Sequence, residues 1–285
     1  MGDWQLIERR DRDLLGEGLC WSGRENALYW TDILAPAINR LDLQSLGVER
    51  CAMPEPVGWL VERKNGGLIA GLQSGIARIA LDPLVIDPVA DLEPHLPNNR
   101  MNDGKADSSG FIWCGTMDFD CEGEAGSLYR VAPDYSWSRI DSGYGVTNGP
   151  AFSPCGNWLY HTDTVRKIIY RFARTPEGAR DREIFISFGP DDGAPDGMTV
   201  DSQGGLWVAH WGASRISRFN PDGRLEKSIS LPAKQITNIT FGGADLDRMF
   251  VTSAAQDLPD SRYDGALFEV DCGGAKGLPT GLFAG

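Results

Sequence analysis

The sequence lacks any long apolar run. No stretch of its 285 residues contains the roughly 18 unbroken apolar residues that a membrane-spanning helix needs. The first residues, MGDWQLIERRDRD, carry charges where a secretory signal peptide needs an apolar segment. We therefore expect a cytoplasmic protein that has no membrane partner.

Cationic side chains are also scarce. The sequence has 27 Lys and Arg residues against 40 Asp and Glu residues, so its formal net charge is −13. Non-specific binding to nucleic acid depends on clustered cationic side chains, so this balance argues against a nucleic-acid partner. With 41% hydrophobic residues, the composition is that of a folded protein and excludes intrinsic disorder.

Several catalytic signatures are missing. There is no GxSxG, HExxH, Walker A or GxGxxG motif, so serine hydrolase, zincin and nucleotide-binding functions lack support. The six cysteines contain no CxxC pair, and we expect them to be reduced. Of the three histidines, His161 and His210 fall in apolar runs and are predicted to be packing residues, whereas His95 precedes a polar segment.

The sequence does contain an internal repeat. Short apolar runs, each preceded by a turn rich in Gly, Asn, Asp or Ser, recur every 40 to 47 residues. Their first apolar residues are Leu28, Leu68, Ile112, Leu159, Leu206 and Met249. A second run with alternating apolar and polar residues, such as INRLDL or IYRFAR, follows each of them, as expected for a strand with one buried face.

Repeats of this length made of short strands are typical of propeller blades with four antiparallel strands. We therefore predict an all-β, six-bladed β-propeller that occupies residues 1–285 as a single domain. A β-sandwich or two separate domains is the alternative interpretation. The segment from Trp4 to Glu8 is expected to pair into the last blade, because ring closure removes exposed sheet edges.

Polar residues recur at one phase of this repeat. Ten or eleven residues before the apolar run, five of the six repeats carry a carboxylate or an amide: Glu17, Asn102, Asn148, Asp196 and Asn238. The second repeat has Val57 and Gly58 there instead. Because the innermost strands of a propeller surround one channel, these side chains are expected to converge near its axis.

The converging oxygen atoms are suited to a hard divalent cation. Glu17 and Asp196 would neutralise a doubly charged ion, and Asn148 would add a neutral oxygen ligand. Three protein ligands leave open positions for water or substrate, which is the arrangement of a catalytic metal site. The alternative is that these polar groups only bind ordered water in the channel.

The segment PNNRMNDGKAD, residues 97–107, is a second group of polar residues. Arg100 and Asn102 are two positions apart, so on an extended strand both side chains would point toward the mouth and donate hydrogen bonds to a ligand. Asp103, Gly104 and Lys105 are predicted to form a turn into the strand. Lys105 and Asp107 are assigned structural roles.

Six segments together resemble the SMP-30/gluconolactonase family of regucalcin-like sugar lactonases. They are GEGLCW around Glu17, NRMNDGKAD around Asn102, GTMD at 115–118, TNGPAFS around Asn148, PDGMTVD around Asp196, and GGLWVAHWGASRISRF. The resemblance implies a six-bladed propeller with one catalytic divalent metal, held by Glu17, Asn148 and Asp196. It also implies that Asp196 is the catalytic acid and base, and that Arg100 and Asn102 bind the lactone. Some members place a substrate-binding Glu shortly after GTM, and no residue of DFDCEGEAG is assigned that role.

The expected function is hydrolysis of a sugar lactone, an aldonolactone, to the open aldonic acid, a carboxylic ester hydrolase reaction. The cation would be Ca²⁺, Zn²⁺, Mn²⁺, Mg²⁺ or Fe²⁺, because oxygen ligands discriminate weakly among them. Two alternatives remain open: phosphotriester hydrolysis on the same metal site, and a non-catalytic metal-binding propeller. The sequence indicates neither the preferred lactone nor an oligomeric state.

Overall fold

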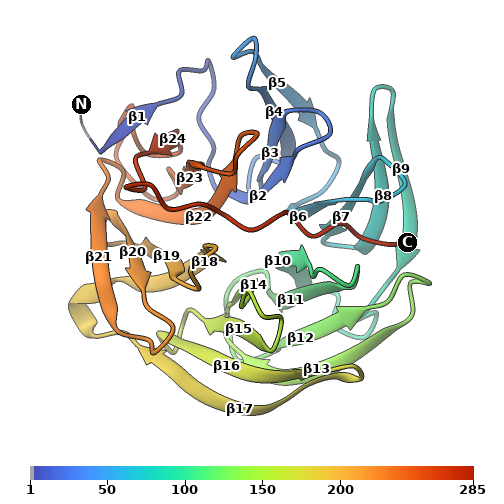
Figure 1. Cartoon of the computed structure of the whole chain (residues 1–285). Coiled ribbons are helices and arrows are strands. Elements are labelled where there is room, and N and C mark those ends of the chain that lie inside the picture. The colour runs from blue at the N-terminus through green and yellow to red at the C-terminus, as the bar shows by residue number, and fades with distance from the viewer. Residues whose placement is uncertain (1–2) are drawn as a thin grey trace.

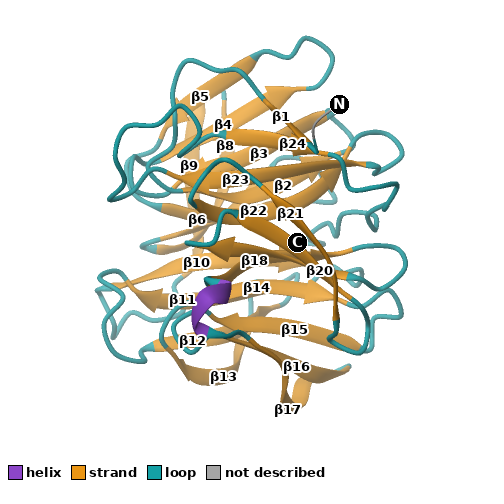
Figure 2. Ribbon diagram, turned by 90° about the vertical axis from the view of Figure 1, so that its left-hand side faces the viewer, coloured by secondary structure: helices purple, strands orange, loops and turns teal. Residues whose placement is uncertain are grey.

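The computed structural model describes residues 3–285 as a ring of six four-stranded antiparallel sheets around a central channel (Figure 1). The predicted all-β, six-bladed propeller is therefore confirmed. One single-turn 3₁₀-helix, η1 (Pro190–Asp192), lies in the loop before β18 (Figure 2). Among residues 3–285, no helix has the length and apolarity required to cross a bilayer.

Blades 1 to 3 follow one another along the chain. Blade 1 contains β2 (Gly16–Ser22), β3 (Ala27–Asp32), β4 (Ala37–Asp42) and β5 (Val48–Ala52). Blade 2 contains β6 (Val57–Glu62), β7 (Leu68–Leu72), β8 (Gly75–Leu81) and β9 (Leu84–Ala90). Blade 3 contains β10 (Asn99–Ala106), β11 (Ile112–Asp118), β12 (Gly126–Val131) and β13 (Trp137–Tyr144).

Blades 4 to 6 complete the ring. Blade 4 contains β14 (Thr147–Phe152), β15 (Trp158–Asp163), β16 (Ile168–Thr175) and β17 (Gly178–Ser187). Blade 5 contains β18 (Ala194–Val200), β19 (Leu206–Trp211), β20 (Arg215–Phe219) and β21 (Leu225–Ser230). Blade 6 contains β22 (Gln235–Gly242), β23 (Arg248–Ala254), β24 (Leu267–Val270) and β1 (Trp4–Leu6).

The repeat found in the sequence corresponds to the second strand of every blade. The six apolar residues that mark it, from Leu28 to Met249, lie in β3, β7, β11, β15, β19 and β23. Burial falls from the axis to the rim: every residue of β2 is buried, whereas only Ile229 of β21 is. The apolar cores lie between neighbouring blades, as in the cluster that contains Trp59 of blade 2 and Tyr129 of blade 3.

The N-terminal strand belongs to the last blade. Strand β1 pairs antiparallel with β24, with Trp4 opposite Val270 and Leu6 opposite Phe268. The strand ends at Leu6, two residues before the predicted limit at Glu8. Asp271 N donates to Asp3 O at 2.8 Å and extends this pairing beyond the strand. Blade 6 is thus built from both ends of the described chain.

The C-terminal segment, residues 271–285, runs across one face of the ring (Figure 1). At one end, Gly277 pairs with Asp201 of blade 5, and Ser202 N donates to Lys276 O at 2.7 Å. At the other end, Phe283 N donates to Glu62 O of blade 2 at 3.0 Å, and the Phe283 ring is fully buried. We call this segment the C-terminal strap.

Candidate functional site

A β-bulge interrupts the innermost strand of every blade. In β2 the register with β3 shifts between Glu17 and Cys20, and in β14 the register with β15 shifts between Asn148 and Ala151. The innermost strands of the other four blades shift in the same part of the strand. A bulge leaves residues unpaired with the neighbouring strand and redirects their side chains. The repeat therefore presents unpaired positions to the channel from all six blades.

The predicted site residues lie at or beside these bulges. Glu17 is on β2, Arg100 and Asn102 are on β10, Asn148 is on β14, and Asp196 is on β18. Each of the five is between 2% and 6% exposed. Buried polar groups require partners, so their hydrogen bonds define the site.

Hydrogen bonds join blades 3 and 4 at this level. Asn102 Nδ2 donates to Thr147 O at 2.5 Å and to Asn148 Oδ1 at 3.2 Å. Asn102 Oδ1 accepts from an Arg100 guanidinium nitrogen at 2.7 Å. Asn148 Nδ2 donates to Thr164 Oγ1 at 2.9 Å, which fixes the amide with its oxygen toward Asn102. Asn102 thus connects the guanidinium group of Arg100 to the amide of Asn148.

A second contact joins blades 6 and 1. Asn238, on β22, is fully buried, and its Nδ2 donates to Glu17 Oε2 at 2.7 Å. The same nitrogen lies 3.5 Å from Asp103 Oδ2 of blade 3, across the channel. Asn238, the fifth residue of the predicted polar phase, therefore links Glu17 and Asp103.

Three buried carboxyl groups influence one another in the channel. Burial, and then the charge of Asp103, raises the pKa of Glu17 to about 8. Burial, followed by the charges of Glu17 and Asp103, raises the pKa of Asp196 well above its usual range. Burial raises the pKa of Asp103 to about 6. Negative charge at this position is costly without a nearby cation.

The prediction of a turn at Asp103, Gly104 and Lys105 is wrong. All three residues belong to β10, and the bulge between Met101 and Gly104 accommodates the irregular backbone. A glycine after an aspartate is typical of a turn, which is why the sequence predicts one here. In the structure, Gly104 instead leaves room for the Trp59 ring, because a Cβ at this position would lie 2.9 Å from that ring. Asp103 was therefore missed as a channel residue, although it directly follows Asn102 of the polar phase.

The missing polar residue of blade 2 has a steric reason. A Cβ on Gly58 would lie 2.5 Å from Met101 O and 2.6 Å from Asn102 O. These distances are shorter than non-bonded atoms tolerate, so only glycine lets β10 approach β6 this closely. The gap in the polar phase thus allows Asn102 to reach its position.

Arg100 combines burial with incomplete hydrogen bonding. Its guanidinium group donates to Met101 O at 3.1 Å as well as to Asn102, but Nε has no partner among residues 3–285. Burial lowers the pKa of Arg100 to about 10, although the charges of Glu17 and Asp196 oppose this effect. A buried donor without a partner is costly, so this group is suited to an acceptor on a ligand.

The loop after GTM lies outside this hydrogen-bonded group. Asp118 and Asp120 both accept hydrogen bonds from Asn98 Nδ2, at 2.9 Å and 3.2 Å. Asp120 is exposed, and none of its hydrogen bonds in the described chain involves Arg100 or Asn102. In the described chain Asp120 thus forms no hydrogen bond with any of the five predicted residues.

Two of the three histidines are buried, and His95 is exposed. His161 is fully buried, with its ring 4.9 Å from that of Tyr144, and burial lowers its pKa to about 3. Burial also lowers the pKa of His210 to about 4, and its Nδ1 lies 2.7 Å from Asp192 O. His161 and His210 are thus neutral packing residues at physiological pH.

The donor set formed by Glu17, Asn148 and Asp196 fits a divalent cation on its chemistry. Within the described chain, no group of three His, Cys, Asp or Glu side chains forms a candidate metal cluster, so a site here depends on the amide oxygen of Asn148. Burial raises the pKa of both Glu17 and Asp196, and the negative charge of Asp103 adds to this repulsion at each of them, as does the charge of Glu17 at Asp196. A cation between them would remove that repulsion and favour the charged carboxylates.

Comparison with known proteins shows the family of this chain. The model of the SMP-30/Gluconolactonase/LRE-like region matches residues 15–255. A 6-deoxy-6-sulfogluconolactonase of Pseudomonas putida is 34% identical over 97% of this chain and 97% of its own length. The pentonolactonase XacC of Haloferax volcanii is 32% identical over 92% of this chain and 89% of its own length.

A solved structure is similar over the whole fold. The calcium-binding protein regucalcin from Agrobacterium tumefaciens superimposes with a TM-score of 0.92 at 29% sequence identity. The match covers 98% of this chain and 96% of that protein. This chain therefore belongs to the SMP-30/gluconolactonase/LRE-like family.

Proposed function

We propose that this protein hydrolyses a sugar lactone, an aldonolactone, to the open aldonic acid. The observation that carries the proposal is the buried group of Glu17, Asp103 and Asp196 beside Arg100 and Asn102. Relatives that match this chain over nearly its whole length are named as lactonases for a sulfogluconolactone and for pentonolactones. These names support the reaction class rather than one sugar.

The proposed ligands of one divalent cation are Glu17, Asn148 and Asp196. When bound, the cation would polarise the lactone carbonyl and stabilise negative charge on its oxygen. Ca²⁺, Zn²⁺, Mn²⁺, Mg²⁺ and Fe²⁺ all accept such oxygen ligands. A similar solved protein is described as calcium-binding, which makes Ca²⁺ the first ion to test.

Asp196 is the proposed proton carrier. Its carboxylate would accept the proton of the attacking water as the new C–O bond forms at the lactone carbonyl. It would then return that proton to the ring oxygen as the ester bond breaks, so that the carboxylate is regenerated. Asp196 is 5% exposed, so few competing water molecules surround it.

Arg100 is proposed to bind the substrate directly, and Asn102 to contribute by holding Arg100 in place. The guanidinium group of Arg100 is fixed by Asn102 Oδ1 and Met101 O, and its unpartnered Nε remains free for a hydroxyl or carbonyl oxygen of the lactone. Both amide hydrogens of Asn102 are directed at Thr147 O and Asn148 Oδ1. Asn102 therefore positions Arg100 relative to the proposed metal ligand Asn148.

The test is acid release from a panel of aldonolactones by metal-stripped protein, with each of the five ions added back in turn. Asp196→Asn should lower kcat about a thousandfold, which is within the usual effect of removing a general acid or base. Asp181→Asn, at an exposed aspartate, is the matched control and should leave the rate unchanged. Undiminished turnover by the Asp196 variant would refute its role.

The same panel separates the alternatives. An aryl dialkyl phosphate tests phosphotriester hydrolysis, for which a more apolar site would be expected than one that contains the buried polar side chains of Arg100 and Asn102. A non-catalytic metal-binding propeller would release no acid from any lactone with any ion. That outcome would overturn the proposed activity while leaving the family assignment intact.

A further inference from the structure

A cavity of about 280 Å³ lies at the end of the channel away from the carboxyl groups. Every innermost strand contributes to its wall, at or just beyond its bulge. Lys105 follows Asn102 by three positions, and Thr199 follows Asp196 by three. Because a strand rises about 3.3 Å per residue, the cavity lies roughly 10 Å along the axis from the proposed catalytic site. We call it the rear cavity.

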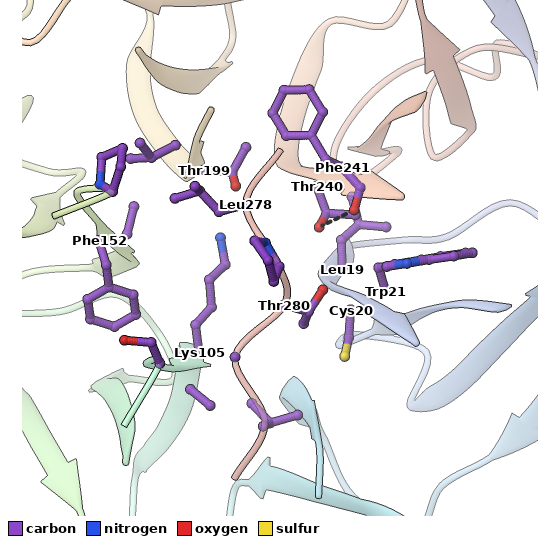
Figure 3. A pocket seen from close by; sticks show the side chains of 18 of the residues that line it. Leu19, Cys20, Trp21, Lys105, Phe152, Thr199, Thr240, Phe241, Leu278 and Thr280 are labelled. Carbon is purple, nitrogen blue, oxygen red and sulfur yellow. Dashed lines mark hydrogen bonds between the residues drawn. The ribbon is translucent and has the colours of Figure 1, made fainter. Parts of the chain in front are cut away.

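The C-terminal strap crosses one side of the rear cavity. Residues 278–281 line it, and Thr280 is exposed. The strap is anchored beyond both edges of the cavity, by the contacts of Gly277 and of Phe283. Figure 3 shows Leu278 of the strap on the same side as Lys105, whereas Thr280 lies on the other side of the strap, toward Cys20.

The charge of this wall is opposite to that of the whole protein. The lining residues include Lys105 and Arg174 but no Asp or Glu, although the chain has a net charge of −13. Arg174 is already neutralised, because it forms an ion pair with Asp107 and donates to Gly156 O at 3.0 Å. The charge of Arg174 is thus accounted for, whereas Lys105 interacts with the charges of Asp103 and Glu17 without forming an ion pair with either in the described chain.

Lys105 has unused hydrogen-bonding capacity. Within residues 3–285 its ammonium group donates one side-chain hydrogen bond, to Met198 O, and takes part in no ion pair. An ammonium group has three N–H donors. The side chain extends into the cavity between Phe152 and the strap (Figure 3). A cation in such surroundings favours an anionic ligand.

The rest of the wall indicates what kind of anion fits. Leu60, Val61, Phe152 and Phe241 provide apolar surface in the cavity wall. The volume is slightly below the range of roughly 300–1,000 Å³ typical of ligand pockets, so the ligand must be small. We propose that the rear cavity binds a short-chain aliphatic carboxylate, with the carboxylate on Lys105 and the alkyl chain on the apolar wall.

The proposed site does not depend on the lactonase proposal, because it lies on the other side of the bulges and can be assayed without metal or lactone. Calorimetric titration of the metal-free protein with hexanoate tests it, and hexan-1-ol serves as the uncharged comparison. The wild type should bind hexanoate, and Lys105→Met should weaken binding about tenfold or more, as expected for loss of a charged hydrogen bond.

Thr280 offers a variant that leaves the channel strands unchanged. Thr280→Asp would place a carboxylate in the cavity wall and should weaken hexanoate binding. Thr280→Asn introduces a side chain of nearly the same shape as Asp but without its charge, and it should not weaken binding. Arg100→Met should bind hexanoate as the wild type does, because Arg100 lies at the other end of the channel. The proposal is overturned if the wild type shows no binding at millimolar hexanoate, if hexan-1-ol binds equally well, if Thr280→Asp has no effect, or if Arg100→Met abolishes binding.

Discussion

Replacing Glu17 with Gln should stabilise the metal-free protein at alkaline pH, although it removes a proposed metal ligand. Glu17 accepts hydrogen bonds from Asn238 Nδ2 at 2.7 Å and from Gly18 N at 3.0 Å, and the amide oxygen of Gln can accept both. What the substitution removes is the charge, in a position where burial and Asp103 oppose ionisation. The variant therefore separates the effect of charge from that of hydrogen bonding.

The magnitude follows from the pKa of Glu17, which is raised from its ordinary 4.5 to about 8. Each pKa unit corresponds to 1.36 kcal/mol, so ionising Glu17 in the folded protein costs about 5 kcal/mol more than in the unfolded chain. Between pH 4.5 and pH 8, Glu17 holds a proton in the folded state and releases it in the unfolded state. The stability that the protonated carboxyl group contributes is therefore complete below pH 4.5 and is lost as pH rises toward 8. The glutamine side chain of the variant does not titrate, so its contribution is independent of pH.

Urea unfolding followed by tryptophan fluorescence, in the presence of a chelator, measures this difference. Between pH 5 and pH 8 the wild type should lose about 4 kcal/mol of unfolding free energy relative to Glu17→Gln. Glu177→Gln, at an exposed glutamate, should track the wild type at every pH. Parallel pH profiles for the wild type and the Glu17 variant would refute the reasoning that Glu17 is buried among like charges.

Three further substitutions test other parts of the structure. As pH falls from 6.5 toward 3, the wild type should lose up to about 1.4 kcal/mol of unfolding free energy per pH unit, because the buried imidazole of His161 stays neutral while the unfolded chain takes up a proton. His161→Phe should not show this loss, which unfolding at stepwise acidic pH would check. Gly58→Ala should cost about 1–3 kcal/mol in thermal unfolding, because its Cβ would overlap Met101 O, whereas Gly23→Ala, with its nearest neighbour at 3.7 Å, should cost little. Arg100→Met should raise KM for the lactone about tenfold and change kcat less, as steady-state kinetics would show.

The blades could be predicted from the sequence because each repeat contains its own turns and alternating strands. Leu28 and Leu206 mark equivalent strands without any knowledge of their neighbours in space. The polar phase was visible for the same reason: Glu17, Asn148 and Asp196 occupy one position of a repeated unit. The sequence therefore supplied both the fold and the phase at which polar side chains meet.

The residues that escaped prediction depend on contacts between blades. Asp103 and Gly104 resemble a turn when they are considered alone, but β10 continues through them because Gly58 lets it lie against β6. The C-terminal strap carries no repeat and no strand periodicity. Its path is fixed by close contacts, such as that between Gly281 and Ala106: a Cβ at position 281 would lie 2.0 Å from Ala106 O. Such contacts are defined only once the ring has closed.

Lys105 connects the two ends of the channel, and this connection can be measured. Its charge acts on Asp103 and Glu17 on one side, while its ammonium group lies in the wall of the rear cavity on the other. A carboxylate bound to Lys105 would offset a positive charge that repels a cation at Glu17. If both proposed sites exist, hexanoate should therefore tighten Ca²⁺ binding, by about fivefold if the coupling is near 1 kcal/mol, and Ca²⁺ should tighten hexanoate binding by the same factor. Calorimetric titration of Ca²⁺ with and without hexanoate, and of hexanoate with and without Ca²⁺, tests this reciprocity, and Thr280→Asp should abolish it. A Ca²⁺ affinity that is unchanged by saturating hexanoate would show that Lys105 does not couple the two sites.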